Sequence, residues 1–165
     1  MKLIFILFFL TSCATYTQVP VLPDYIKNIY IETFSNRTVF YGLEQKMRED
    51  LINEFLNEGR LGIAAKKELA DAILEGIITR YELQPLKYDA SEVVQEYKLS
   101  MDVSFRFIDK TGKVLYEEDN LHYDITYYPP GSTVEGVTIE TENEAQERLI
   151  KEVVQEIVQL ITRWR

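Results

Sequence analysis

The sequence predicts an α+β fold, a two-layer sandwich in which a four-stranded sheet carries two helices packed on one face, in the order β-α-β-β-β-α. Three patterns in the 165 residues support this prediction. Apolar and polar residues alternate over residues 96–107, which is typical of a strand with one buried face. Apolar residues recur at helical spacing over 43–56 and again over 145–164. Hydrophobic residues make up 46% of the chain, which suffices for one core and excludes a disordered chain.

The first predicted strand and helix occupy residues 27–59. Lys27–Phe34 is rich in β-branched and aromatic residues, and the turn and cap formers Ser35–Thr38 follow it. From Tyr41 onward we expect a helix, and Gly59 stands where a glycine would end it. The predicted buried face of this helix comprises Leu43, Met47, Leu51 and Phe55.

Three strands are predicted in the middle of the chain. Residues 72–83 are apolar on both faces, which favours a central strand, and Gly76 indicates a bulge or a close approach. We expect Pro85 to end this strand. The alternating strand over 96–107 turns back near Gly112, which suits a left-handed hairpin position, and residues 114–127 form the return strand.

A capping box predicts where the last helix begins. Thr141 and Glu144 have the spacing at which each side chain satisfies one free N–H group of the other residue. Apolar residues then follow at helical spacing: Ala145, Leu149, Val153, Ile157, Ile161 and Trp164. The residues between the last strand and this helix, which include Tyr128-Pro129-Pro130-Gly131, are expected to form a loop.

The N-terminus has the composition of an export signal. Residues 1–12 contain Lys2 and eight consecutive apolar residues, too few to span a bilayer. Leu10-Thr11-Ser12-Cys13 resembles a bacterial lipobox, which implies lipidation of Cys13; the alternative is a short buried strand that ends in a cysteine. Residues 13–24 would then be an acylated cysteine and its tether, and 25–165 one globular domain. Ala14 after the cysteine implies sorting to the outer membrane, with the domain on the periplasmic side.

Composition excludes several classes of function. A formal charge of −9 argues against nucleic-acid binding, which needs a basic surface. One cysteine and one histidine exclude internal disulfides and zinc sites of several cysteines.

Residues that could carry catalysis are few. His122 lies beside Asp124 and would be needed for a hydrolase, but no G-x-S-x-G motif accompanies it, and an exposed strand histidine is the better interpretation. Glu117-Glu118-Asp119 could supply acid–base or cation chemistry, yet consecutive strand residues point to opposite faces. We therefore expect no enzyme, no metal and no cofactor other than a covalent lipid on Cys13.

A binding protein fits the sequence better. Tyr88 and Tyr128 lie beside prolines in predicted loops, which makes them candidate partner contacts. The polar face of the alternating strand carries Lys98, Ser100, Asp102, Ser104 and Arg106. Such a face is compatible with plain solvent or with the polar lumen of a large membrane barrel.

A lipobox cysteine and tether precede an ordered set of short motifs: Ile29 to Thr38, Gly42-Leu43-Glu44, Glu54-Phe55, Gly59-Arg60-Leu61, Ala70 to Gly76, Pro85, Tyr88-Asp89, Glu96-Tyr97, the hairpin at Asp109, Tyr128-Pro129 and Asn143-Glu144-Ala145. This order resembles the LptE family of lipopolysaccharide-assembly lipoproteins. The resemblance covers essentially the whole chain after Cys13.

The resemblance implies a non-enzymatic outer-membrane subunit that is a plug and assembly partner of the β-barrel protein LptD and binds lipopolysaccharide. The nearest basic candidates for that ligand are Arg80, Lys87, Lys98 and Arg106. The acidity of the chain departs from what binding of an anionic glycolipid suggests. The alternative hypothesis is an envelope lipoprotein that acts as activator or adaptor of a periplasmic enzyme or secretion channel.

Overall fold

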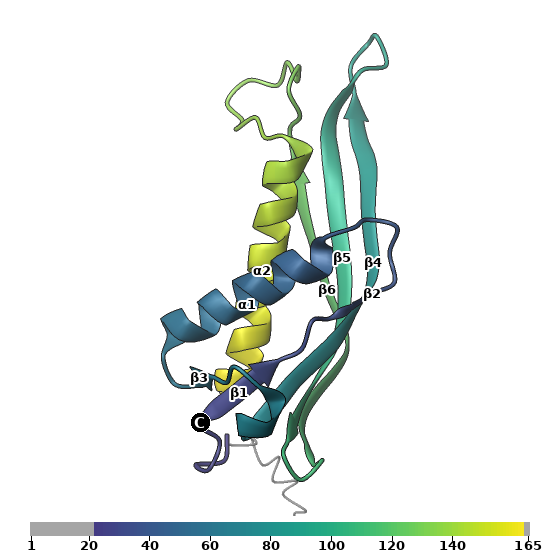
Figure 1. Ribbon diagram of the computed structural model, residues 1–165. Coiled ribbons are helices and arrows are strands. Elements are labelled where there is room, and N and C mark those ends of the chain that lie inside the picture. Colours follow the sequence, from purple (N-terminus) through teal and green to yellow (C-terminus); the bar gives the residue numbers. More distant parts are fainter. Residues whose placement is uncertain (1–21, 164–165) are drawn as a thin grey trace, which may run out of the picture.

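The computed structural model describes residues 22–163, and within them two helices pack on one side of a six-stranded mixed sheet (Figure 1). The strands are β1 (Asn28–Ile31), β2 (Ser35–Asn36), β3 (Gly62–Ile63), β4 (Ala72–Tyr88), β5 (Val94–Asp109) and β6 (Val114–Tyr127). The helices are α1 (Leu43–Glu58) and α2 (Glu142–Thr162), with a 3-10 turn η1 at Lys67–Leu69. The α+β class and the two helices are confirmed, whereas the predicted count of four strands is wrong.

The two additional strands, β2 and β3, are each two residues long. The sheet order is β3-β1-β4-β5-β6, and β2 lies beside β4 at Ile77 and Ile78. β1, β2 and β3 make parallel pairs, while β4, β5 and β6 form an antiparallel meander. A strand of two residues is too short for apolar and polar residues to alternate recognisably, so the sequence pattern does not predict β2 or β3.

β4 continues through Pro85 to Tyr88, which corrects the prediction that Pro85 ends the strand. Within the described residues, no strand pairs with the outer edge of β4 beyond Ile78. Pro85 therefore lies on an edge, where its missing N–H costs no ladder hydrogen bond. The central position predicted for the first part of this strand is confirmed, because β4 lies between β1 and β5.

The core lies between the sheet and both helices. The predicted face of α1 is fully buried, and its members are Leu43, Met47, Leu51 and Phe55. Gly59 ends α1 in the left-handed conformation with φ 81°, and the capping box of Thr141 and Glu144 begins α2, both as predicted. Gly76 is a close approach: a Cβ there would lie 2.5 Å from the ring of Phe34.

β4 and β5 are unusually long, with 17 and 16 residues. At about 3.3 Å per residue they span roughly 55 Å, far more than a usual strand of 3–10 residues. One end of the sheet therefore extends beyond α2 (Figure 1). We call this the distal end; it consists of the β4–β5 hairpin (residues 84–96) and the loop 128–141. Gln95 joins the two parts, because its Oε1 accepts the backbone N–H of Thr133 at 2.6 Å.

Candidate functional site

Cys13, the signal and most of the tether lie outside the described residues 22–163, so lipidation stays a prediction. The candidates inside that range fall into two groups: charged side chains on the sheet face opposite the helices, which we call the open face, and aromatic side chains at the distal end.

All four predicted basic residues lie on the open face. Lys98 and Arg106 share one face of β5 because they are an even number of residues apart. Arg80 and Lys87 of β4 lie opposite Asp102 and Glu96 of β5 in the strand register. A bulge between Ile78 and Arg80 shifts the alternation of β4 and brings Arg80 to this face.

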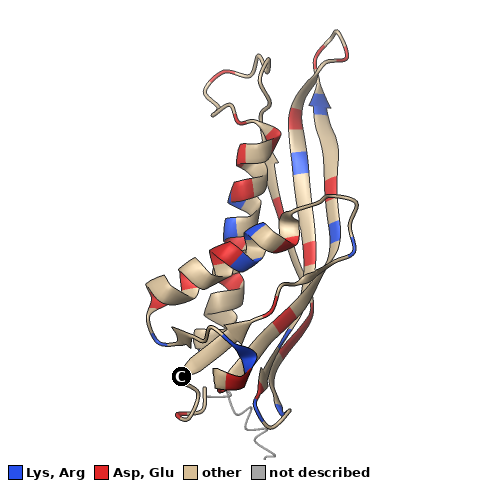
Figure 2. Ribbon diagram, viewed as in Figure 1, with Lys and Arg blue, Asp and Glu red and all other residues tan. Residues whose placement is uncertain are grey.

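Each of these four cations is paired with a carboxylate from its own or a neighbouring strand. Arg80 Nε lies 2.8 Å from Asp102, and its Nη1 3.4 Å from Glu82; Lys98 Nζ lies 3.6 Å from Asp124. Arg106 pairs with Glu75, and Lys87 with Glu96, a contact that raises the pKa of Lys87. Red and blue residues accordingly occur together along β4 and β5 in Figure 2. The four cations face five carboxylates, so they do not form a basic patch.

His122 lies at the centre of this network. Its Nδ1 lies 2.5 Å from Asp102 Oδ1, and its Nε2 lies 3.2 Å from Asp124 Oδ1. Both ring nitrogens thus face carboxylates, and neither is directed at a serine or threonine hydroxyl. The prediction of an exposed strand histidine agrees with a side chain that is 39% exposed. Its contact with Asp102 depends on the β5–β6 register and was not predicted.

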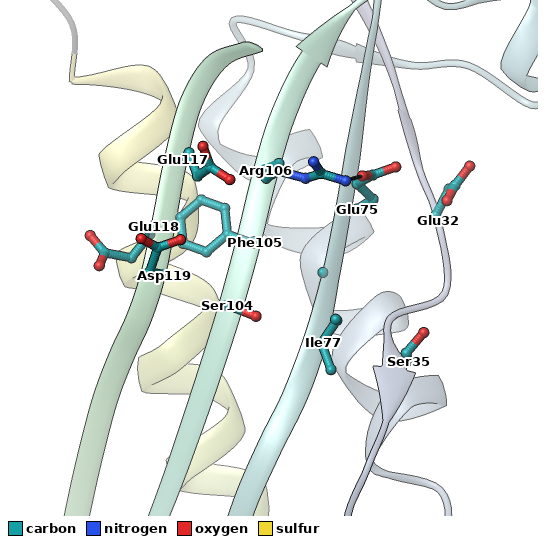
Figure 3. Close-up of a pocket in the computed structure, with 11 residues that line it drawn as sticks. Glu32, Ser35, Glu75, Ile77, Ser104, Phe105, Arg106, Glu117, Glu118 and Asp119 are labelled. Atoms are coloured by element: carbon teal, nitrogen blue, oxygen red, sulfur yellow. Dashed lines mark hydrogen bonds and ion pairs between the residues drawn. The ribbon is translucent and has the colours of Figure 1, made fainter. Parts of the chain in front are cut away.

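A cavity of about 370 Å³ lies on the open face, toward the end of β4, β5 and β6 that is opposite the distal end (Figure 3). Arg106 extends across it toward Glu75, and Glu117, Glu118 and Asp119 approach from β6. Glu117 lies opposite Arg106 in the register, whereas Glu118 lies opposite Phe105, whose side chain is buried in the core. Glu117 and Glu118 therefore lie on opposite faces of β6, as expected of consecutive strand residues, although both border the cavity. Among residues 22–163, no cluster of three or more His, Cys, Asp or Glu side chains is suited to hold a metal ion.

The two tyrosines predicted as partner contacts both lie at the distal end. Tyr88 is 57% exposed at the end of β4, and Tyr128 begins the loop after β6. Further exposed apolar side chains lie on the same hairpin and loop: Leu86, Val93, Val134 and Ile139. The structure thus places the tyrosines among apolar residues that sequence analysis did not identify.

Val39 and Tyr41 are also exposed, 82% and 99% respectively, and were missed as candidates. Tyr41 was assigned to the start of the first helix, but α1 begins at Leu43. No sequence pattern identifies these two residues, because polar and apolar residues do not alternate here; only the structure shows that Ser35, Arg37, Val39 and Tyr41 are exposed and the residues between them partly buried.

The family model described as lipopolysaccharide-assembly, LptE, matches residues 26–163. This match extends over nearly all the residues that the structure describes. No curated protein sequence matches the chain. Among residues 22–163, neither helix is long and apolar enough to cross a membrane.

Several solved structures resemble the fold. Uncharacterized lipoprotein B from Nitrosomonas europaea is 19% identical, with a TM-score of 0.53 over 90% of this chain and 87% of that one. A DUF330 protein from Xanthomonas campestris is 15% identical, with a TM-score of 0.57 over 87% and 90%. PelC from Paraburkholderia phytofirmans, crystallised as a dodecamer, is 12% identical, with a TM-score of 0.55 over 87% and 93%. At these identities the similarity concerns the fold alone.

Proposed function

The chain belongs to the LptE family of lipopolysaccharide-assembly proteins, and on this premise we propose that it is a lipid-anchored plug and assembly partner of an LptD-type β-barrel in the outer membrane. Cys13 carries the lipid on the periplasmic side, and residues 14–24 tether the domain. The family is one of assembly rather than catalysis, and the protein acts by binding. The match over residues 26–163 is the observation that carries the proposal.

The open face supports a place inside a barrel. A barrel lumen is polar, and a face of paired charges is compatible with it. Within residues 22–163 the helices cover only the other side of the sheet, which leaves the open face for a partner (Figure 1). Tyr88 and Tyr128 at the distal end supply the aromatic contacts that are enriched at protein interfaces.

Lipopolysaccharide, in this proposal, contacts Arg80, Lys87, Lys98 and Arg106. Three of these cations are about half exposed or more, and Lys98 is 33% exposed. The pairs of Lys98 and Arg106 involve carboxylates that are 40% and 29% exposed, and such exposed pairs contribute only about 0.2–1 kcal/mol each, so a phosphate group can replace these partners at small cost. Replacement costs more at Lys87 and Arg80, because their partners Glu96 and Asp102 are only 9% and 15% exposed. The overall acidity is therefore compatible with local binding of an anionic glycolipid.

Crosslinking followed by purification from outer membranes tests the plug role. The tagged chain is expected to recover one large heat-modifiable barrel protein, identified by mass spectrometry. Cys13→Ser should move the chain from the membrane to the soluble envelope fraction, because stable anchoring requires acyl chains. Recovery of a cell-wall enzyme, a secretion channel or a ring of this chain alone would instead favour the activator or adaptor hypothesis.

A charge-matched pair of variants tests the lipid contact. Alanine at Arg80, Lys87, Lys98 and Arg106 should weaken binding of purified lipopolysaccharide, because all four lie on the open face. The control replaces four exposed lysines that form no ion pair with any other residue of 22–163, and it changes the net charge equally: Lys27, Lys66, Lys113 and Lys151. Equal binding by both variants would remove the open face as the ligand site.

A further inference from the structure

The segment between β1 and α1 presents a row of side chains to solvent. Over residues 35–42 the exposed and partly buried positions alternate, although the chain bends at Thr38 and Val39 and turns at Tyr41 and Gly42. Only Ser35 and Asn36 pair with β4, and the last backbone bond runs from Arg37 N–H to Ile78 O at 3.0 Å. Beyond that point the segment projects outward past the outer edge of β4 (Figure 1).

The inward-facing residues of this segment hold its backbone in place. The Asn36 side chain makes most of these hydrogen bonds. Its Oδ1 accepts one from the backbone N–H of Thr38 at 2.9 Å and one from Thr38 Oγ1 at 2.8 Å. Its Nδ2 donates to the carbonyl oxygen of Phe40 at 2.7 Å and to Glu44 at 2.8 Å. The ring of Phe40 packs edge-on against Tyr81 with centroids 4.6 Å apart. The loop is therefore ordered by its own contacts before any partner binds.

The outward-facing residues form what we call the outward row: Arg37, Val39 and Tyr41. Tyr41 is 99% exposed and Val39 82% exposed, so neither contributes to the core. Arg37 is exposed, and its guanidinium has no carboxylate partner within residues 22–163. Arginine and tyrosine are both enriched at interface hot spots. A backbone already fixed by hydrogen bonds reduces the ordering cost of association.

We propose that the outward row docks onto the barrel partner, with Tyr41 and Val39 in an apolar pocket and Arg37 facing a carboxylate. This inference rests on the proposed function and identifies the outward row as a surface that contacts the barrel. A protein surface fits better than a lipid phosphate, because two of the three side chains are uncharged and apolar in most of their area. The unpaired cation supplies the charge complementarity that selects an acidic site on the partner.

Site-specific photocrosslinking tests the inference in cells that carry the full-length chain. Benzoylphenylalanine at position 41 should form an adduct with the barrel. The double variant Arg37→Ala with Tyr41→Ala should lower barrel recovery at least about tenfold, the effect expected of a hot spot. Leu69→Ala is the matched control, because Leu69 is 67% exposed on η1 and should leave recovery unchanged. Thermal melting of each variant checks that the fold is intact.

The outcomes separate the two proposals. If the parent chain recovers the barrel and the double variant recovers it equally well, the outward row is not the contact and the plug role stands. An adduct of position 41 with lipopolysaccharide or with a second copy of the chain also overturns the inference. If the parent chain recovers no barrel, the plug role and the docking inference both fail.

Discussion

Replacement of Gly76 by alanine should destabilise the fold, because the ring of Phe34 and the backbone of β5 already occupy the space that the added Cβ would need. The added Cβ would lie 2.5 Å from Cε2 and 2.8 Å from Cδ2 of Phe34, and 2.7 Å from the backbone oxygen of Ser104. Ordinary contacts of a Cβ begin at 3.4 Å, so the Phe34 ring would have to move by about 0.9 Å. Phe34 is 2% exposed and the Ser104 oxygen belongs to β5, so neither neighbour can move freely.

The expected magnitude follows from two opposing effects. Overpacking of a core costs about 1–3 kcal/mol. Alanine also restricts the unfolded chain, which offsets about 0.4–1 kcal/mol of that cost. With the middle of each range the net loss is about 1.3 kcal/mol, which corresponds to a melting temperature lower by about 3–5 °C for a domain of this size.

Urea and thermal unfolding of Gly76→Ala would measure this loss, with Gly62→Ala as the control. Gly62 is also a strand glycine, but its added Cβ meets the Oδ1 atom of Asn28, the end of an exposed side chain that can rotate away. Gly62→Ala should therefore change the free energy of unfolding by less than about 0.5 kcal/mol. A Gly76→Ala chain as stable as its parent would refute the close-packing argument.

Three further predictions concern stability. Leu51→Ala removes a fully buried side chain of α1 and should lower the free energy of unfolding by about 2–5 kcal/mol, measured in urea. Thr141→Ala removes the side-chain cap of α2 and should lower it by about 0.5–2 kcal/mol, with reduced helical circular dichroism on mild heating. Hydrogen bonds from Thr111, Lys113 and Tyr25 lower the pKa of Asp109 to about 2, against 3.8 when unfolded. Its contribution is therefore present above about pH 4 and is lost as the pH falls toward 2, so Asp109→Asn should show a shallower acid limb in unfolding measured from pH 5 to 2.

The long elements were predictable because each repeats a period many times. β6 was placed at Val114–Tyr127 from its alternation and its hairpin, and the structure gives the same bounds. The start of α2 followed from the capping box of Thr141 and Glu144. β2 and β3 escaped prediction because their pairing depends on residues distant in sequence. Pro85 was misjudged because the sequence does not reveal which part of β4 is an edge.

The charged site was predictable in part. Alternation placed Lys98 and Arg106 on one face of β5, and the structure agrees. Their carboxylate partners were not predictable, because they depend on the register between strands and on bulges such as the one after Ile78. The pairing of His122 with Asp102 has the same origin.

The position of α2 after all the strands in the sequence has a consequence for the time course of folding. Eight buried side chains of the core come from this helix: Ala145, Leu149, Ile150, Val153, Val154, Ile157, Val158 and Ile161. β1 also depends on residues distant in sequence, because it can pair with the sheet only through contacts such as that between Ile29 and Ala72 of β4. Contacts between segments so far apart in sequence make folding slow compared with that of a helical bundle. A chain that still lacks residues 142–162 therefore has no complete core.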